Sequence, residues 1–161
     1  MDRTDLDETE HYSVINNCLH SLFSQCSVTL NGIPITPSKN LYNYRAYHET
    51  LLTHGEDAAT SHLTNAFWYL DTGNVIACDP TAATTTTTDK GAIDRWNRSK
   101  QRKVVEMYGR MHSDLFNVPQ LLLPGVQIQI KFTKSKKGFY LLVPKNDTEA
   151  VFKFIDVTYV K

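Results

Sequence analysis

The stretch LLLPGVQIQIKFTKSKKGFYLLV, residues 121–143, carries the clearest structural pattern in the sequence. Apolar and polar side chains alternate within it, and the apolar members are Val126, Ile128, Ile130 and Phe132. This period of two predicts a strand with one buried face. Turn-forming residues flank the strand, and residues 139–143 and 150–160 predict two more strands after it. The last third of the chain is therefore predicted to be an antiparallel meander.

A second strand pair is predicted from residues 26–35, CSVTLNGIPI. Asn31-Gly32 favours a type I′ turn, because both central positions of that turn need a positive φ. Pro34 lacks the N–H that a sheet ladder uses, so the strand after the turn should be an edge strand.

Helical periodicity interrupts the strands in the first half of the chain. Residues 12–23 predict a short amphipathic helix, and residues 56–69 predict another. A helix over residues 41–54 would carry a single stripe of larger apolar side chains, namely Leu41, Tyr44, Tyr47, Leu51 and Leu52. The predicted fold class is therefore mainly β, with helices inserted in the first half.

Two segments lack a pattern that could bury a core. Residues 1–13 are acidic, and we predict a disordered arm there. The run of five threonines from Thr84 to Thr88 lies in a polar segment, and residues of about 79–103 are predicted to form a flexible loop. Residues 14–161 then make up one domain.

Composition excludes several classes of protein. The 161 residues include 17 basic and 17 acidic side chains, so the formal net charge is zero and a strongly electrostatic partner is not favoured. Apolar runs are too short for a membrane span, and the acidic first ten residues do not resemble a secretory signal. Cys18, Cys26 and Cys78 are odd in number and lack C-x-x-C spacing, which argues against a disulfide framework and a structural zinc site.

No set of residues in the sequence supplies the roles of a catalytic site. The six histidines include no pair four residues apart, and His112 with Asp114 suggests no third metal ligand. Glycine-rich phosphate loops and G-x-S-x-G motifs are absent from the sequence. We therefore predict a protein that is not an enzyme and that needs no metal or cofactor.

Two groups of residues are candidates for binding. Aromatic side chains are enriched at the centres of interfaces, which makes Tyr42, Tyr44 and Tyr47 candidate interface residues. A basic group with an interleaved aromatic could hold a single nucleic-acid strand. Its members are Arg95, Trp96, Arg98, Lys100, Arg102 and Lys103. A solvated loop is the preferred interpretation of that basic segment, because the whole chain is neutral.

Several strings in the sequence together resemble a known family. They are LHSLFSQCSVTLNG at 19–32, NLYNYRAYHETLLTHG at 40–55, SHLTNAFWYLDTG at 61–73, RMHSDLF at 110–116 and LLLPGVQIQIKFTKSKKGFY at 121–140. In this order they resemble part of the first half of the double jelly-roll major capsid protein of Polinton (Maverick) elements and adintovirus-like viruses. The resemblance covers roughly residues 14–161.

The resemblance implies a structural role. Proteins of that family trimerise, tile an icosahedral shell with other capsid subunits, and use no catalytic residue or cofactor. It implies a partial antiparallel jelly-roll sandwich with the helical segment inserted between strands, in a virion or inside a cell. The family's proteins are longer, with strands before the LHSLF string and a second jelly roll, so we expect a fragment or remnant of a virus-like mobile element. The alternatives are a domesticated host binding module and a weak single-stranded nucleic-acid binder.

Overall fold

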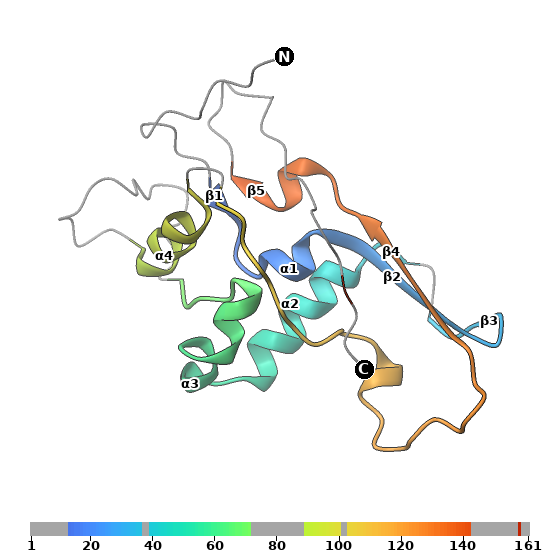
Figure 1. The fold of residues 1–161 in the computed structure, drawn as a ribbon. Helices are drawn as coiled ribbons and strands as arrows, with labels where there is room; N and C mark the ends of the chain where they lie inside the picture. The colour runs from blue at the N-terminus through green and yellow to red at the C-terminus, as the bar shows by residue number, and fades with distance from the viewer. Residues whose placement is uncertain (1–12, 37–38, 72–88, 101–102, 143–157, 159–161) are drawn as a thin grey trace, which may run out of the picture.

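The computed structural model describes residues 13–36, 39–71, 89–100, 103–142 and 158. Its strands form two antiparallel sheets, and helices pack beside them (Figure 1). The smaller sheet pairs β1 (Ser13–Val14) with β5 (Leu141–Leu142). The larger sheet has three strands in the order β3-β2-β4.

The larger sheet contains the hairpin predicted from Asn31-Gly32. Strand β2 (Phe23–Leu30) turns into β3 (Ile33–Pro34) through Asn31 at φ 48° and Gly32 at φ 80°, so both turn residues have the expected positive φ. Pro34 lies in the edge strand β3, where its missing N–H breaks no ladder. Both predictions are confirmed.

Strand β4 (Ile128–Lys134) also has the predicted one-sided burial, but its partner differs from the prediction. It pairs with β2 across about a hundred residues of chain, with Val28 opposite Ile130. The pairing is favourable because the apolar rows of both strands cover the same core, which contains Cys26, Val28, Ile130 and Phe132.

The predicted meander is therefore wrong for the described residues. The chain leaves β4 through a short 3₁₀ turn, η4 (Lys137–Phe139), and β5 then joins β1 in the other sheet. Of the third predicted strand, residues 150–160, only Thr158 lies within the described residues.

The predicted helix over residues 12–23 is also wrong. Only α1 (Cys18–Ser21) is helical there, because β1 and β2 take up the two ends of the segment. Asn16 accepts a hydrogen bond from the backbone N–H of Tyr69 and donates to the Tyr69 carbonyl, at 2.9 and 2.7 Å. Asn17 has a left-handed backbone, φ 57°. These two residues use their hydrogen-bonding capacity outside a helix, as asparagine often does.

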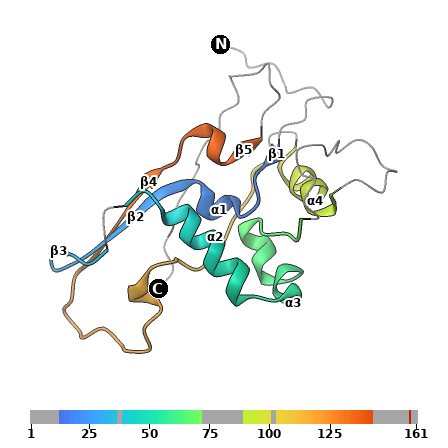
Figure 2. The ribbon, with the colours of Figure 1, turned by 180° about the vertical axis from the view of Figure 1, so that it is seen from behind.

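The next helices follow the predicted ranges more closely. Helix α2 (Tyr42–Thr53) is confirmed. The predicted helix over residues 56–69 is divided into α3 (Glu56–Ala59) and the 3₁₀ helix η1 (His62–Ala66). Figures 1 and 2 show β2 and β4 projecting as an arm, with α1 and α2 at its base and α4 at the end of the molecule away from β3.

Helix α4 (Lys90–Ser99) corrects the prediction of a flexible loop over residues 79–103. Asp89 caps it by accepting a hydrogen bond from the backbone N–H of Gly91 at 2.9 Å. The threonine run and the acidic arm up to residue 12 lie outside the described residues, whereas Ser13, which we assigned to the arm, belongs to β1.

Two clusters form the hydrophobic core. One gathers Val14, Cys18, Leu22, Phe67 and Tyr140 at the junction of the two sheets. The other lies between α2 and the β2–β4 pair, and its buried members are Cys26, Val28 and Tyr42. Within the described residues, no helix has the length and apolar composition that a bilayer crossing requires.

Candidate interface on helix α2

Helix α2 turns most of its larger apolar side chains outward, Tyr42 excepted. Leu41, just before the helix, is 54% exposed, Tyr44 is 50% exposed, Leu51 is 51% exposed and Leu52 is 80% exposed. Tyr47 is 40% exposed. We name these five residues the α2 stripe. An amphipathic surface helix normally buries such a stripe against its own core, so this orientation is the reverse of the usual one.

The inner face of α2 carries mostly small or polar side chains instead, and Tyr42 in its first turn is the large side chain buried there. Its buried residues include Asn43, Ala46 and Thr50, and Ala46 is completely inaccessible. The Thr50 hydroxyl donates to the Ala46 carbonyl at 2.8 Å, which satisfies it within the helix. Small side chains at Ala46 and Thr50 allow the helix to approach α1 and β2 closely.

Two tyrosines of the stripe are held on one side by aromatic contacts. The Tyr44 ring meets the Phe139 ring edge-on, with centroids 5.4 Å apart. The Tyr47 ring lies 5.1 Å from the ring of Trp68, which is buried. Each ring is therefore positioned while part of its surface stays open, which lowers the entropy that a partner would have to remove on binding.

A polar cluster, which we name the α2 clamp, fixes the helix to the segment that precedes β4. It consists of Arg45, Glu49, His112 and Asp114. The Arg45 Nε atom lies 2.6 Å from Glu49 Oε1. The Nη1 and Nη2 atoms of Arg45 lie 3.2 Å from Asp114 Oδ2 and 2.5 Å from Asp114 Oδ1, respectively. His112 Nδ1 lies 2.7 Å from Glu49 Oε2. The fork of Arg45 thus joins both carboxylates.

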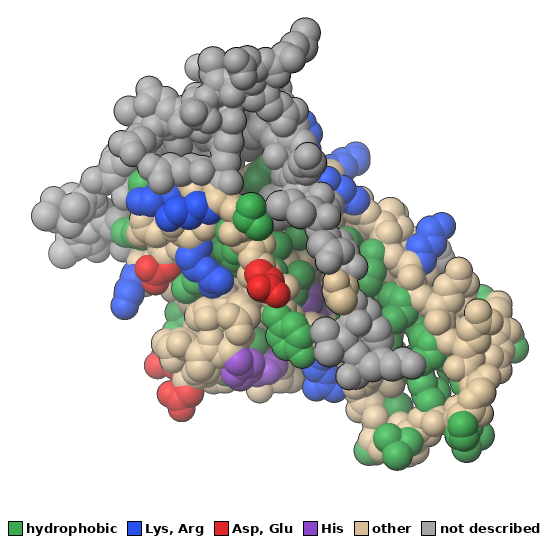
Figure 3. All heavy atoms as spheres, in the orientation of Figure 1, with side chains coloured by type: hydrophobic (Ala, Val, Ile, Leu, Met, Phe, Trp, Pro, Cys, Tyr) green, Lys and Arg blue, Asp and Glu red, His purple; other side chains and the backbone are tan. Residues whose placement is uncertain are grey.

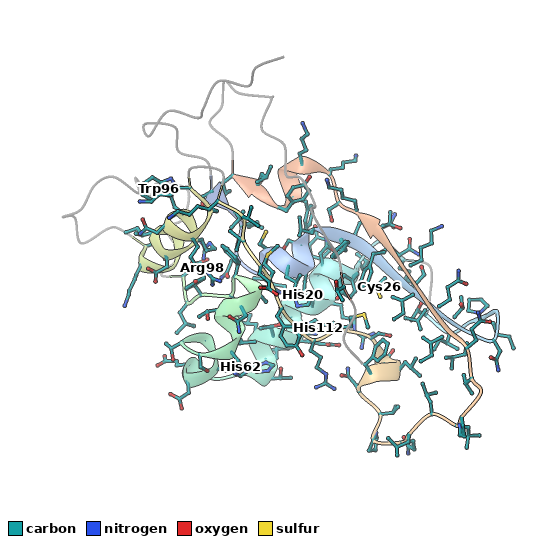
Figure 4. All side chains as sticks on the ribbon, viewed as in Figure 1. His20, Cys26, His62, Trp96, Arg98 and His112 are labelled. Carbon is teal, nitrogen blue, oxygen red and sulfur yellow. The ribbon has the colours of Figure 1, made fainter. Side chains whose placement is uncertain are left out.

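The clamp continues inward through two histidine rings. His20 and His112 meet edge-on with centroids 4.6 Å apart (Figure 4), and His20 Nδ1 lies 3.1 Å from the Tyr42 hydroxyl. Burial, and secondarily the nearby His112, lowers the pKa of His20 to about 3. His20 is therefore neutral at physiological pH.

The acidic members of the clamp are charged at neutral pH. Burial raises the pKa of Glu49, but the hydrogen bonds from His112 and Arg45 outweigh it, and the net pKa is lowered. The hydrogen bond from Arg45 lowers the pKa of Asp114. Each charged group of the clamp is satisfied by another of its members, so the arrangement can hold α2 in position but offers no unpaired nucleophile or base.

The predicted interface tyrosines fall into two classes. Tyr44 and Tyr47 lie on the exposed stripe. Tyr42 does not: its side chain is buried, its hydroxyl is bonded to His20, and its ring lies 6.0 Å from that of Phe132. The core needs Tyr42 to close the space between α2 and β4, so its assignment as an interface residue is corrected.

The predicted nucleic-acid residues do not form a basic surface. Arg95 is completely buried, and its Nη1 atom lies 2.7 Å from Asp71 Oδ1. Arg98 donates to the Thr64 carbonyl at 2.6 Å and to the Tyr69 hydroxyl at 3.0 Å, and its guanidinium lies over the Phe67 ring.

Among the remaining residues of that group, Lys100 lies over the ring of Trp96, and Lys103 is exposed (Figure 4 shows Trp96 and Arg98 on α4). Arg102 lies outside the described residues. The guanidinium groups of Arg95 and Arg98 therefore bind groups inside the molecule and do not contribute to a basic surface.

The cysteines within the described residues are not paired with one another. Cys18 and Cys26 are buried free thiols, and burial raises the pKa of each, to about 12 and about 11. In the part of the chain that the structure describes, no three His, Cys, Asp or Glu side chains gather as a metal site would need. Cys78 lies outside that part.

The α2 clamp and the leucines of the stripe were not among the candidate site residues predicted from the sequence. Two local signals pointed to the clamp: the Arg45–Glu49 spacing of four, which favours an ion pair on a helix, and the His112–Asp114 spacing of two. Neither signal indicates that the two pairs meet, because 63 residues separate Glu49 from His112.

Comparison with known proteins gives one informative similarity. The chain is 26% identical over 143 residues to Uncharacterized protein F54H12.2 of Caenorhabditis elegans. The similarity covers 89% of this chain but 30% of the worm protein, so the chain spans less than a third of that relative's length. No family model and no solved structure matches the chain.

Proposed function

We propose that this chain is a structural, capsid-type protein that acts by burying interfaces between subunits and performs no catalysis. The observation that carries the proposal is the outward-facing α2 stripe. Single exposed leucines are ordinary on protein surfaces, but a helix that presents three leucines and two positioned tyrosines is typical of a surface with a partner.

The strand pairing supports a jelly-roll architecture for the domain. Strand β1 pairs with β5, and β2 pairs with β4, so the pairings are nested along the chain. A jelly roll arises when such a nested, long-range antiparallel ribbon wraps into two sheets, whereas a meander pairs neighbours. The nested order, together with the sequence resemblance to double jelly-roll capsid proteins, favours the jelly roll.

The polar groups support a structural role as well. The α2 clamp joins its charged groups to one another, and the buried thiols have raised pKa values. Such pairing fits a part that must hold a surface rigid. The internal contacts of Arg95 and Arg98 weigh against the nucleic-acid alternative.

Light scattering on a size-exclusion column tests the proposal. The wild-type chain of 18.3 kDa should elute as an assembly of several copies. A Tyr44→Ser/Leu51→Ser variant should elute as a monomer with an unchanged circular dichroism spectrum. The matched control is Val104→Ser/Tyr108→Ser, which removes similarly exposed apolar side chains elsewhere and should leave the assembly intact.

Two outcomes would contradict the proposal. A folded wild-type chain that stays monomeric at high concentration would favour the domesticated binding module. A stripe variant that assembles like the wild type would remove α2 from the interface.

A further inference from the structure

A second apolar surface lies on the loop between η3 (Asp114–Phe116) and β4. Leu121 is 95% exposed, Leu123 is 77% exposed, Leu122 is 44% exposed and Val118 is 48% exposed. We name these four residues the leucine tip. The loop closes through Gly125 at φ 89°, and the Val126 N–H donates to the Leu123 carbonyl at 3.4 Å.

The base of the tip is tied to the β2–β3 hairpin. The Asn31 N–H donates to the Gln127 carbonyl, and the Gln127 N–H donates to the Asn31 side chain, both at 2.9 Å. The loop therefore leaves a fixed base, and Figures 1 and 2 show it projecting past η3, on the side away from α2. Within one copy, the leucine tip and the α2 stripe are separate surfaces.

The leucine tip and the chain segments on either side of it carry no charged side chain. Residues 115–130 include no acidic or basic side chain, and neither do residues 21–36 of the adjoining hairpin. Figure 3 shows hydrophobic side chains at this end of the molecule, without lysine, arginine, aspartate or glutamate beside them in that view. A partner for this tip therefore has to offer an uncharged apolar surface, because a buried unpaired charge would be costly.

The α2 stripe offers such a surface. Its five members are uncharged, the exposed His48 lies among them against the Tyr47 ring, and Arg45 and Glu49 of the same helix are paired to each other in the clamp. The exposed pair Val104 and Tyr108 is a poorer match, because it offers two apolar side chains rather than five and the exposed Lys103, Glu106 and Arg110 lie beside it along the chain. Among the described residues, the leucine tip is therefore a projecting apolar surface, and the α2 stripe is an apolar helix face that can receive it.

We propose that the leucine tip of one copy docks on the α2 stripe of a second copy, so that subunits associate head to tail. The inference rests on the proposed structural function and specifies its interface. Contact between two different surfaces is heterologous, and its repetition closes into a ring when the rotation allows. Leucine and tyrosine side chains make up the contact on both sides, which suits the centre of an interface.

A mixing experiment tests this arrangement. The tip variant is Leu121→Ser/Leu123→Ser, and the stripe variant is Tyr44→Ser/Leu51→Ser. Each should be monomeric alone, because each lacks one of the two surfaces. Their equimolar mixture should give a 1:1 heterodimer of twice 18.3 kDa that grows no further, since only one junction is intact. Different affinity tags and native mass spectrometry identify the two chains in it.

Site-directed cross-linking gives a second measurement that does not depend on breaking the assembly. Chains carrying Leu123→Cys should form a disulfide with chains carrying Leu51→Cys when the two are mixed under oxidising conditions. Each of these variants alone should yield at least tenfold less cross-linked dimer.

The outcomes separate this inference from the function on which it rests. A monomeric wild type overturns both. A wild type that assembles, with a tip variant that still assembles or with a mixture that stays monomeric, overturns the head-to-tail contact and leaves the structural function standing. Efficient cross-linking of Leu51→Cys chains with one another would indicate a two-fold contact between stripes instead.

Discussion

Helices α2 and α4 bury different kinds of side chain, and in each helix the choice of buried residues departs from what side-chain hydropathy predicts. Helix α2 exposes two leucines and two of its three tyrosines, and beside Tyr42 it buries Asn43, Ala46 and Thr50. Helix α4, in a polar and basic segment, buries Arg95 completely. The comparison teaches that the space and the charge offered by neighbouring elements decide burial, and that hydropathy sets only a preference.

The physical reason is visible at each helix. Beneath α2 lie β2 and α1, and small residues let the helix approach them. Beneath α4 lies Asp71, whose carboxylate gives Arg95 a charge partner at 2.7 Å. Gly91 allows α4 to pack closely against residues 69–71, because a Cβ there would lie 2.6 Å from Asp71 Oδ1.

The largest expected effect comes from breaking the buried ion pair of α4. Arg95→Met should lower the free energy of unfolding by about 3–5 kcal/mol, because it leaves Asp71 without its cation. Burial already raises the pKa of Asp71 against the opposing influence of Arg95, so the carboxylate depends on that partner. Urea unfolding followed by circular dichroism measures the loss.

The double variant Arg95→Met/Asp71→Asn is the control for that prediction. It removes both charges and should recover most of the lost stability, since a neutral pair needs no counter-charge. If it is as unstable as the single variant, Arg95 matters through its packing and the charge argument fails.

A smaller effect is expected where α4 meets the segment 69–71. In Gly91→Ala the new methyl group would approach the Leu70 carbonyl oxygen to 2.9 Å, so the helix must shift. This overpacking should cost about 1–3 kcal/mol, partly offset by the better helix propensity of alanine. Thermal unfolding tests it against Gly138→Ala, where the added methyl meets nothing within 4 Å. Equal melting temperatures for the two variants would speak against a close contact at Gly91.

The buried polar group beneath α2, His20, is neutral, whereas the one on α4, Arg95, is charged. The stability of the protein should therefore fall at acidic pH because of His20. The pKa of His20 is about 3 in the folded protein, against 6.5 for an ordinary histidine. Between these values the unfolded chain binds a proton that the folded chain does not, so stability falls as the pH decreases through this window. The loss between pH 6.5 and about pH 5 should be roughly 1.5 kcal/mol.

His20→Gln identifies the source of that slope. Glutamine can keep a hydrogen bond to Tyr42 and does not titrate, so the variant should lose most of the dependence in this window. Glu49 and Asp114 act in the same direction only at lower pH, because their pKa values are lowered from 4.5 and 3.8. Parallel unfolding curves for variant and wild type would assign the slope to another group.

The smallest expected effect is on the exposed face of α2. Leu52 is 80% exposed, and Leu52→Ser should change the free energy of unfolding by no more than about 0.5 kcal/mol. On the inner face, Ala46→Leu should cost about 1–3 kcal/mol, because that position has no free space. Chemical denaturation of the two variants, at a concentration where the chain is monomeric, compares the two faces directly. A large loss for Leu52→Ser would mean that the stripe packs within its own chain.

Much of the local structure could be predicted from the sequence, and the candidate site only in part. Tyr44 and Tyr47 were expected at an interface and lie on an exposed face, but Tyr42 was grouped with them although it is core. A helical wheel separates Tyr42 from Tyr44, yet it does not indicate which side meets the sheet. The α2 clamp was beyond prediction, since Glu49 and His112 become neighbours only when the chain folds.

Short-range interactions account for the features that follow directly from the amino-acid sequence. The Asn31-Gly32 turn needs residues that accept positive φ, and the alternation through Ile128, Ile130 and Phe132 makes one face of β4 apolar. Helix α2 follows from its own periodicity and composition. In each case the decisive interactions lie within a few residues of one another along the chain.

The pairing of the strands, the face of α2 that is buried and the burial of Arg95 depend on contacts between segments that are distant along the chain. The β2–β4 pair joins segments about a hundred residues apart, and β5 crosses to β1 rather than continuing from β4. Alternation makes a strand ready to pair but does not select its partner. That choice depends on which apolar rows can cover a common core, and the same packing leaves the α2 stripe and the leucine tip exposed.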